Sequence, residues 1–300
     1  MDIRLGTIFC GGHQKEASQI ELKDTLTVEQ FKKFKESISE INKLQRLRDL
    51  LSILLLNENE FLTSMETVSF KLATKGTHWR GIKEIDMEEV SIAANRLFLN
   101  YLSSVRAFID HCKTNINRYF GANSENFSEF KKMLSFFYDD IFAYRFLYKL
   151  RNYSQHCGIP INSITFNQQF NAENNTVDGT LEVMFDRNQL LSNYDGWGEK
   201  IKVELQQKTE TFDVASLMIK NTLCVKEVEH NIELFHKDSL LEAINYITNI
   251  SGHLRQENYE VIVAYDFRTD ENGNLSKFQN LPVPFEKIDL IKNILFQDNQ

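Results

Sequence analysis

Cysteine is scarce in this sequence, and its four copies are far apart. Cys10, Cys112, Cys157 and Cys224 form no Cys-x-x-Cys pair. This spacing is unlike the frameworks of disulfide-rich secreted proteins and unlike the ligand pairs of zinc sites. We therefore expect reduced thiols, a cytoplasmic location and no metal site.

Proline, glycine and long apolar runs are also scarce. Three prolines and twelve glycines in 300 residues argue against a disordered or loop-rich chain. The longest apolar run, LLSILLL at 50–56, is far too short to span a bilayer. The N-terminal sequence lacks a basic region followed by an apolar stretch, so we expect neither a signal peptide nor a membrane partner.

An excess of basic charge is missing as well. The net charge is −8, so the field of the whole protein does not attract nucleic acid. A nucleic-acid site would have to be a local basic patch.

What the sequence does have is helical periodicity. Thr27 and Gln30 form a capping box that opens a helix from Val28 to about Met65, with a break expected near Gln45. A second capping box, Asp86 with Glu89, is expected to open a long helix that ends at Gly121. Its apolar residues follow the spacing of three and four that marks one buried stripe: Val90, Ala94, Leu97, Tyr101, Val105, Phe108, Cys112 and Tyr119.

A further helix is expected to run from about residue 125 to Gly158 and Pro160. Its apolar seam alternates steps of four and three, as antiparallel bundles do, at Phe130, Leu134, Phe137, Ile141, Tyr144 and Tyr148. The sequence around it predicts a β-hairpin near 163–186, more helix to about 256, and a strand at YEVIVAYDF with a hairpin partner. The fold class is therefore mainly α, with peripheral β-strands and hairpins.

Three segments follow from this reading. Residues 1–85 hold a strand and helix, residues 86–256 a helical core with the hairpin inserted, and residues 257–300 a C-terminal strand, hairpin and short helix. All three could belong to one domain.

The end of the helix that contains the apolar seam carries the residues that suggest chemistry, in the stretch RNYSQH at 151–156. An Arg can hold a phosphate and stabilise the charge that develops on it, which gives Arg151 a role. His156, in the last helical turn, can take and return a proton near neutrality. Asn152 can orient the imidazole or bond the phosphate. These three groups suffice for cleavage of RNA by attack of the 2′-hydroxyl on its own phosphate, with no metal and no cofactor.

Helical geometry separates these groups. Arg145, Lys149, Asn152 and His156 are spaced by four or three residues, which predicts one polar ridge in which Arg145 and Lys149 guide the RNA backbone. Arg151 instead continues the seam after Tyr148, about 140° round a straight helix from His156. The two can meet if the long Arg side chain curls, if the helix bends, or if a second subunit completes the site.

The motif resembles the Arg-polar-x3-His signature of the HEPN superfamily, whose all-α domains occur in toxin–antitoxin, abortive-infection and CRISPR-associated ribonucleases. The resemblance covers 86–160. It implies a HEPN-like antiparallel helical bundle, a homodimer whose two motifs share one cleft, and Arg151, Asn152 and His156 as the catalytic set of an endoribonuclease in phage defence or a toxin–antitoxin pair. The chain departs from the family in its greater length and its flanking strands.

Two alternatives accompany this interpretation. A second Arg-x4-His pair, Arg106 with His111, lacks the following Asn, so we interpret it as structural or, with Asp110, as a neighbour of the first motif across two helices. The whole bundle could also be a non-catalytic module that binds a protein or nucleotide partner, or a regulatory subunit such as an antitoxin.

Overall fold

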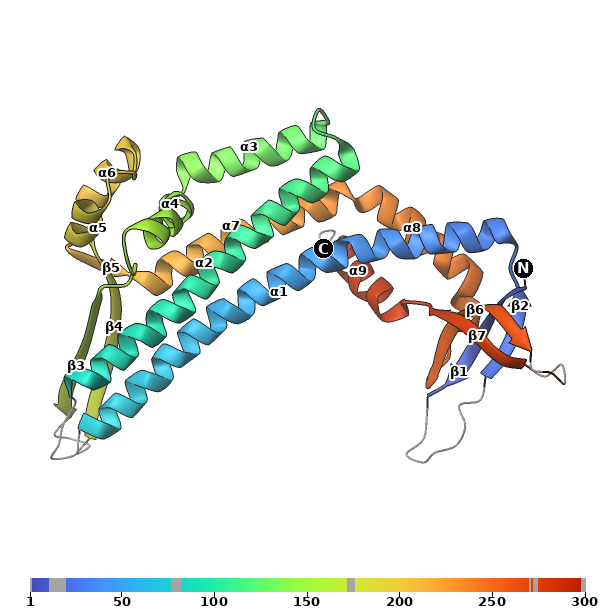
Figure 1. Ribbon diagram of the computed structural model, residues 1–300, viewed down its shortest axis with the longest axis horizontal. Coiled ribbons are helices and arrows are strands. Elements are labelled where there is room, and N and C mark those ends of the chain that lie inside the picture. The colour runs from blue at the N-terminus through green and yellow to red at the C-terminus, as the bar shows by residue number, and fades with distance from the viewer. Residues whose placement is uncertain are drawn as a thin grey trace. The chain divides into compact units, whose positions relative to one another are not determined.

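The computed structural model is mainly α-helical with a few antiparallel strands, as the sequence predicts (Figure 1). It describes residues 2–10, 20–76, 83–171, 176–269, 271 and 275–297. Contacts divide the chain into two compact units, one of residues 1–46 with 233–300 and one of residues 47–232. The predicted boundaries after 85 and 256 do not coincide with this division, because the chain passes between the units within two helices.

The first unit contains a four-stranded antiparallel sheet in the order β2-β1-β6-β7. Its strands are β1 (Ile3–Phe9), β2 (Ile20–Thr25), β6 (Tyr259–Thr269) and β7 (Leu275–Pro282). The predicted C-terminal strand and its hairpin partner are thus confirmed as β6 and β7. Helices α8 (Lys237–Ser251) and α9 (Phe285–Gln297), the short 3-10 helix η1 (Gly252–Leu254) and the start of α1 complete the unit.

Helix α1 (Val28–Gly76) begins where the first capping box predicts. The Thr27 amide donates to the Gln30 side chain at 2.8 Å, and the Gln30 amide donates to the Thr27 hydroxyl at 3.1 Å. The expected break near Gln45 is wrong, because the helix is continuous to Gly76. Nothing in that stretch is a helix breaker, since it contains neither Pro nor Gly.

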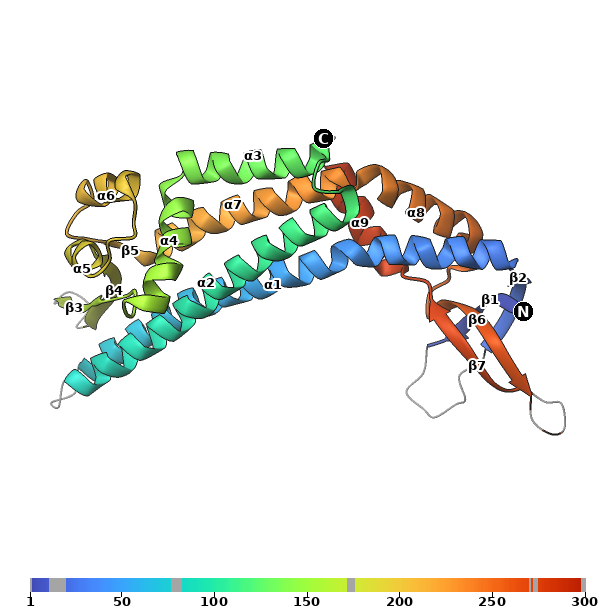
Figure 2. The ribbon, with the colours of Figure 1, turned by 45° about the horizontal axis from the view of Figure 1, so that its top comes forward.

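The second unit is built from the rest of α1, helix α2 (Glu84–Phe120), helices α3 to α6 and most of α7 (Val214–Phe235). The predicted hairpin is present as β3 (Ser163–Asn171) and β4 (Thr176–Asp186), with the short β5 (Thr211–Asp213) beside β4. Helix α4 (Phe142–His156) packs on α2 in this unit (Figures 1 and 2).

Helix α2 buries most of its predicted stripe, with Ala94, Tyr101, Phe108 and Cys112 fully enclosed. The predicted Asp86–Glu89 capping box is wrong. The helix starts at Glu84 after the cap Lys83, three residues earlier than that box implies, and the Asp86 carboxylate accepts the Lys83 amide at 2.8 Å. Asp86 is therefore the third residue of the helix, where a carboxylate reaches back to the cap.

An aromatic cluster forms the core beneath α4. Trp197 is stacked between Phe146 at 5.5 Å and Tyr153 at 5.7 Å, centroid to centroid, and its indole donates to the Leu190 carbonyl at 2.9 Å. These rings lie on one side of α4 (Phe142–His156) and against the segment around α5 (Arg187–Asn193). The opposite side of α4 is therefore left to face α2 and α7.

The single long helix predicted from residue 125 to 158 is wrong, because the chain breaks at Ile141 into α3 (Glu125–Asp140) and α4. Ile141 adopts an extended conformation with φ −112° and ψ 106°. Two side chains satisfy carbonyls that the break leaves without helical partners: Arg145 donates to Tyr138 and Lys200 of α6 (Glu199–Gln206) donates to Asp139. The break is thus stabilised by tertiary contacts that local sequence does not reveal.

Arg145 is also ion-paired inside the fold. Its side chain is 2% exposed and forms a bidentate pair with Glu204 of α6, in which Nε lies 3.1 Å from Oε2. This burial and pairing argue against the expected contact of Arg145 with the RNA backbone, which stays a prediction.

Replacing Arg145 by Met should destabilise the second unit. The change leaves the partly buried Glu204 carboxylate unpaired and one end of α3 without its cap, and we expect a loss of about 2–4 kcal/mol in the free energy of unfolding. The control is Lys202→Met, which removes an exposed pair with Glu199 on α6 and should cost under about 0.5 kcal/mol. Denaturant unfolding of both variants provides the comparison, and equal losses would contradict the structural role of Arg145.

In the first unit, Glu40 accepts hydrogen bonds that make its ionised form favourable. His236 Nδ1 lies 3.6 Å from the carboxylate, Lys43 Nζ 2.6 Å and Ser239 Oγ 2.9 Å. His236 first, and then Lys43 and Ser239, lower the pKa of Glu40 from 4.5 to about 2, against the opposing effect of burial.

A lowered pKa in the folded state stabilises the protein above the unfolded value, and this stabilisation is lost as pH falls. Between about pH 5 and pH 2 the wild type should therefore lose on the order of 2 kcal/mol more than Glu40→Gln. Thermal unfolding across this pH range tests the difference, with Glu36→Gln, an exposed carboxylate one turn earlier, as the control. Parallel pH profiles for wild type and Glu40→Gln would refute the linkage.

Candidate functional site

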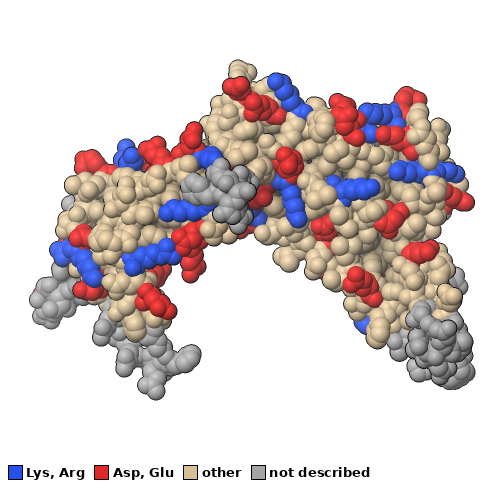
Figure 3. Space-filling model, turned by 180° about the vertical axis from the view of Figure 1, so that it is seen from behind, with Lys and Arg blue, Asp and Glu red and all other residues tan. Residues whose placement is uncertain are grey.

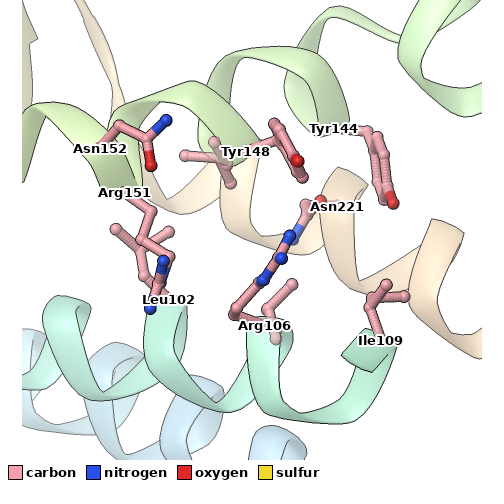
Figure 4. A pocket seen from close by; sticks show the side chains of 10 residues that line it. Leu102, Arg106, Ile109, Tyr144, Tyr148, Arg151, Asn152 and Asn221 are labelled. Atoms are coloured by element: carbon pink, nitrogen blue, oxygen red, sulfur yellow. The ribbon is translucent and has the colours of Figure 1, made fainter. Parts of the chain in front are cut away.

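A pocket lies where α4 crosses α2 and faces α7, and two of the motif residues line it (Figure 4). Arg151 and Asn152 come from the last turns of α4, Arg106 from α2 and Asn221 from α7. Tyr144, Leu147 and Tyr148 of α4 and Leu102, Val105 and Ile109 of α2 complete the lining. The continuation of the seam through Tyr148 to Arg151, expected from helical spacing, is confirmed by this shared face.

Arg151 is half-buried, and its charge has no partner among the residues that the structure describes. Among the described residues, no carboxylate or carbonyl accepts a hydrogen bond from its guanidinium. Figure 4 shows the side chain extending from α4 into the space above α2. A partly desolvated cation without a counter-ion is unfavourable by itself, so the position is suited to an anion that the described part of the chain does not supply.

Arg106, in contrast, is fully engaged. Its Nε lies 2.8 Å from the Asp110 carboxylate one turn along α2, and its guanidinium lies over the ring of Tyr148 at 5.5 Å. Burial alone would lower the pKa of Arg106, but the Tyr148 hydroxyl and the Asp110 carboxylate outweigh it and raise the pKa. Arg106 therefore brings a fixed, flat cation to the pocket with most of its charge already balanced.

The deeper lining is apolar, apart from one amide that is held in place. Leu102 and Leu147 are buried, and burial raises the pKa of the Tyr144 hydroxyl, which stays neutral at physiological pH. Asn221 is 1% exposed, and its Nδ2 donates to the Tyr101 hydroxyl at 3.0 Å. The Tyr101 hydroxyl donates in turn to the Met218 carbonyl at 2.9 Å, so the amide has a fixed orientation.

His156 lies outside this pocket. It is the last residue of α4 and is exposed, and the helix stops after it with Cys157 as the cap and Gly158 at φ 147°. The predicted catalytic set is thus divided within one chain, with Arg151 and Asn152 in the pocket and His156 on the surface beyond its lining. This division agrees with the large angle expected between Arg151 and His156 on a straight helix.

The predicted polar ridge does not form, because Arg145 is buried against α6. Lys149 is half-buried and outside the pocket lining, and its contact with RNA stays a prediction. Of the three residues expected near the first motif from α2, Arg106 lines the pocket, Asp110 balances it, and His111 is exposed and outside the lining.

Sequence reasoning missed Asn221 and the role of Tyr148. Asn221 is about 70 residues beyond the motif, in a helix whose register against α4 no local pattern reveals. Tyr148 was placed in a buried seam, yet it is 45% exposed at the pocket. Arg106 and Asp110 meet Tyr148 only because α4 crosses α2. The spacing of residues along one helix does not predict where another helix crosses it.

The surface shows why any polyanion site must be local. On the face in Figure 3, basic and acidic side chains are interspersed over the described residues. Several exposed cations there and elsewhere are ion-paired, including Arg96 with Glu60 and Lys33 with Glu242.

Over the described ranges, no group of three or more His, Cys, Asp or Glu side chains is arranged to hold a metal ion. None of the described helices combines the length and apolar character needed to cross a membrane.

Comparison with known proteins finds no family model, no curated protein and no solved structure that matches this chain.

Neutralising either of the two pocket arginines should change the stability of the protein in opposite directions. Arg151→Gln removes an unpaired, half-buried charge, and we expect the free energy of unfolding to stay unchanged or rise by up to about 1 kcal/mol. Arg106→Gln removes an ion pair and a cation–π contact, and we expect a loss of about 0.5–1 kcal/mol. Urea unfolding of both proteins measures the contrast. A larger loss for Arg151→Gln would mean that Arg151 is a structural residue.

Proposed function

We propose that this protein is a metal-independent endoribonuclease of HEPN type, acting on RNA in the cytoplasm as a homodimer. The observation that carries the proposal is the Arg151 guanidinium, which no described residue pairs, beside Asn152 in an open pocket at the end of α4. A phosphodiester is an anion that Arg151 and Asn152 could bind, and the His156 of a second copy would then act on it. A phage-defence or toxin–antitoxin role, with a protein regulator, is part of the same proposal.

In the proposed reaction, Arg151 binds the non-bridging phosphate oxygens and stabilises their growing charge. One imidazole removes the proton of the 2′-hydroxyl, and the P–O2′ bond forms as the P–O5′ bond breaks. A protonated imidazole gives its proton to the leaving 5′-oxygen. When a second copy supplies the His156 beside each Arg151, that one imidazole can act first as base and then as acid, and the products are a 2′,3′-cyclic phosphate and a 5′-hydroxyl.

Cleavage of end-labelled RNA in EDTA tests this reaction. We expect wild type to give 2′,3′-cyclic phosphate ends, and we expect His156→Ala and Arg151→Gln to reduce the rate by about 100-fold or more. His111→Ala, an exposed histidine on α2, is the matched control and should keep its activity. RNA with 2′-O-methyl groups should resist cleavage, because its attacking oxygen is blocked. Activity that survives in His156→Ala would contradict the mechanism.

Mixing the two inactive variants tests whether His156 of one copy serves Arg151 of another. Half of the dimers in a re-equilibrated mixture combine one Arg151→Gln chain with one His156→Ala chain, and one of their two sites is intact. We expect recovery of about a quarter of the wild-type activity. If mixing the two variants restores no cleavage, Arg151 and His156 of each site would have to come from the same chain.

A second candidate function is favoured by the position of His156 outside the pocket lining. The same bundle could bind a phosphate-bearing ligand without cutting it, as a regulatory or antitoxin-like subunit. RNA binding that depends on Arg151, without cleavage and without recovery on mixing, would favour this alternative.

A further inference from the structure

The pocket contains more than an anion site requires. A phosphate needs a cation and a few hydrogen-bond donors, and Arg151 with Asn152 supplies them near the opening. Behind them lie four apolar side chains, Leu102, Val105, Ile109 and Leu147, which do nothing for a phosphate. An apolar floor behind a cation is suited to a ligand that carries a ring as well as a charge.

The size of the pocket limits that ring. Its volume is about 100 Å³, and a cavity of about 150 Å³ lined by apolar side chains holds one benzene ring. The enclosed space is smaller than that cavity, so it admits at most one six-membered ring, with part of the ring in the opening. A fused pair of rings would need the walls to move apart.

Two groups are placed to recognise such a ring by its face and its edge. The guanidinium of Arg106 is held against Tyr148, and planar guanidinium groups stack on nucleobases as aromatic rings do. The Asn221 amide lines the pocket at 1% exposure with one N–H given to Tyr101, so its second N–H and its oxygen could reach only a base edge that enters to full depth. In the view of Figure 4, Arg106 from α2 and Asn221 from α7 both lie to the right of Arg151.

We infer that the pocket binds one pyrimidine nucleotide of the RNA chain, with the base between the apolar floor and Arg106 and the phosphate on Arg151. This inference rests on the proposed function, since it assigns the substrate of the same site. Arg106 and Asn221 are then substrate-binding residues that position the phosphate for attack. Cleavage would occur next to a pyrimidine.

Titration of the intact protein with UMP, CMP, AMP, GMP and inorganic phosphate, followed by calorimetry, tests the inference apart from cleavage. We expect the two pyrimidine nucleotides to bind at least about fivefold more tightly than the purine nucleotides and about tenfold more tightly than phosphate. Arg151→Gln should lower the affinity for all five probes. Arg106→Gln should lower the affinity for the nucleotides more than the affinity for phosphate, because it removes the stacking surface.

Two further variants make the test specific. Val105→Ala shortens a half-buried side chain in the pocket wall and so enlarges the pocket without a change of charge. It should bring the affinities for AMP and GMP closer to those for UMP and CMP. Arg118→Gln makes the same charge change as Arg106→Gln at an exposed position of α2 and should leave every affinity unchanged.

Equal affinity for all four nucleotides, a preference for purines, or no binding of any nucleotide would overturn the inference. RNA cleavage by the same preparations separates the two claims. Cleavage without base preference keeps the proposed function and removes the pyrimidine site. Pyrimidine binding without cleavage keeps the site and removes the nuclease.

Discussion

The buried ion pair between Arg145 and Glu204 is the interaction on which the site depends. It fixes the start of α4 against α6 and, through the Tyr138 carbonyl, stabilises the break that lets α4 take a direction of its own. With the aromatic cluster around Trp197 on one side, the other side of α4 has to face α2 and α7. Tyr148 and Arg151 reach the pocket for this reason.

Two arginines six residues apart on one helix therefore have opposite environments. Arg145 is enclosed and completely paired, and it serves the fold. Arg151 is half-buried and unpaired among the described side chains, which makes it a poor contributor to stability. Residues that reduce stability while they face a pocket are typical of binding and catalytic sites. This contrast, more than the spacing of the motif, is the physical reason to assign a function to Arg151.

Most of the correct predictions concern features that are decided by local interactions, although two local predictions, the break near Gln45 and the Asp86–Glu89 capping box, are wrong. The capping box at Thr27, the stripe of α2, the end at Gly121 and the two hairpins all depend on neighbours within a few residues. Sequence reasoning failed at Ile141 because the break is stabilised by Arg145 and Lys200, and the latter lies about 60 residues further along the chain. The same limit explains why Arg145 was assigned to RNA and why Asn221 was missed. The separation of Arg151 from His156 was predictable, since it follows from the helical repeat alone.

The claim that Arg151 is the anion-binding group of this protein can be tested directly by NMR of the arginine Nε–Hε groups. The measurement adds an RNA dinucleotide with a 2′-deoxy group at the position of attack, which binds without being cut. The account predicts that the Arg151 signal shifts and its guanidinium rotation slows, while the signal of the exposed Arg118 stays in place. A bound dinucleotide that leaves the Arg151 signal unchanged would contradict the account.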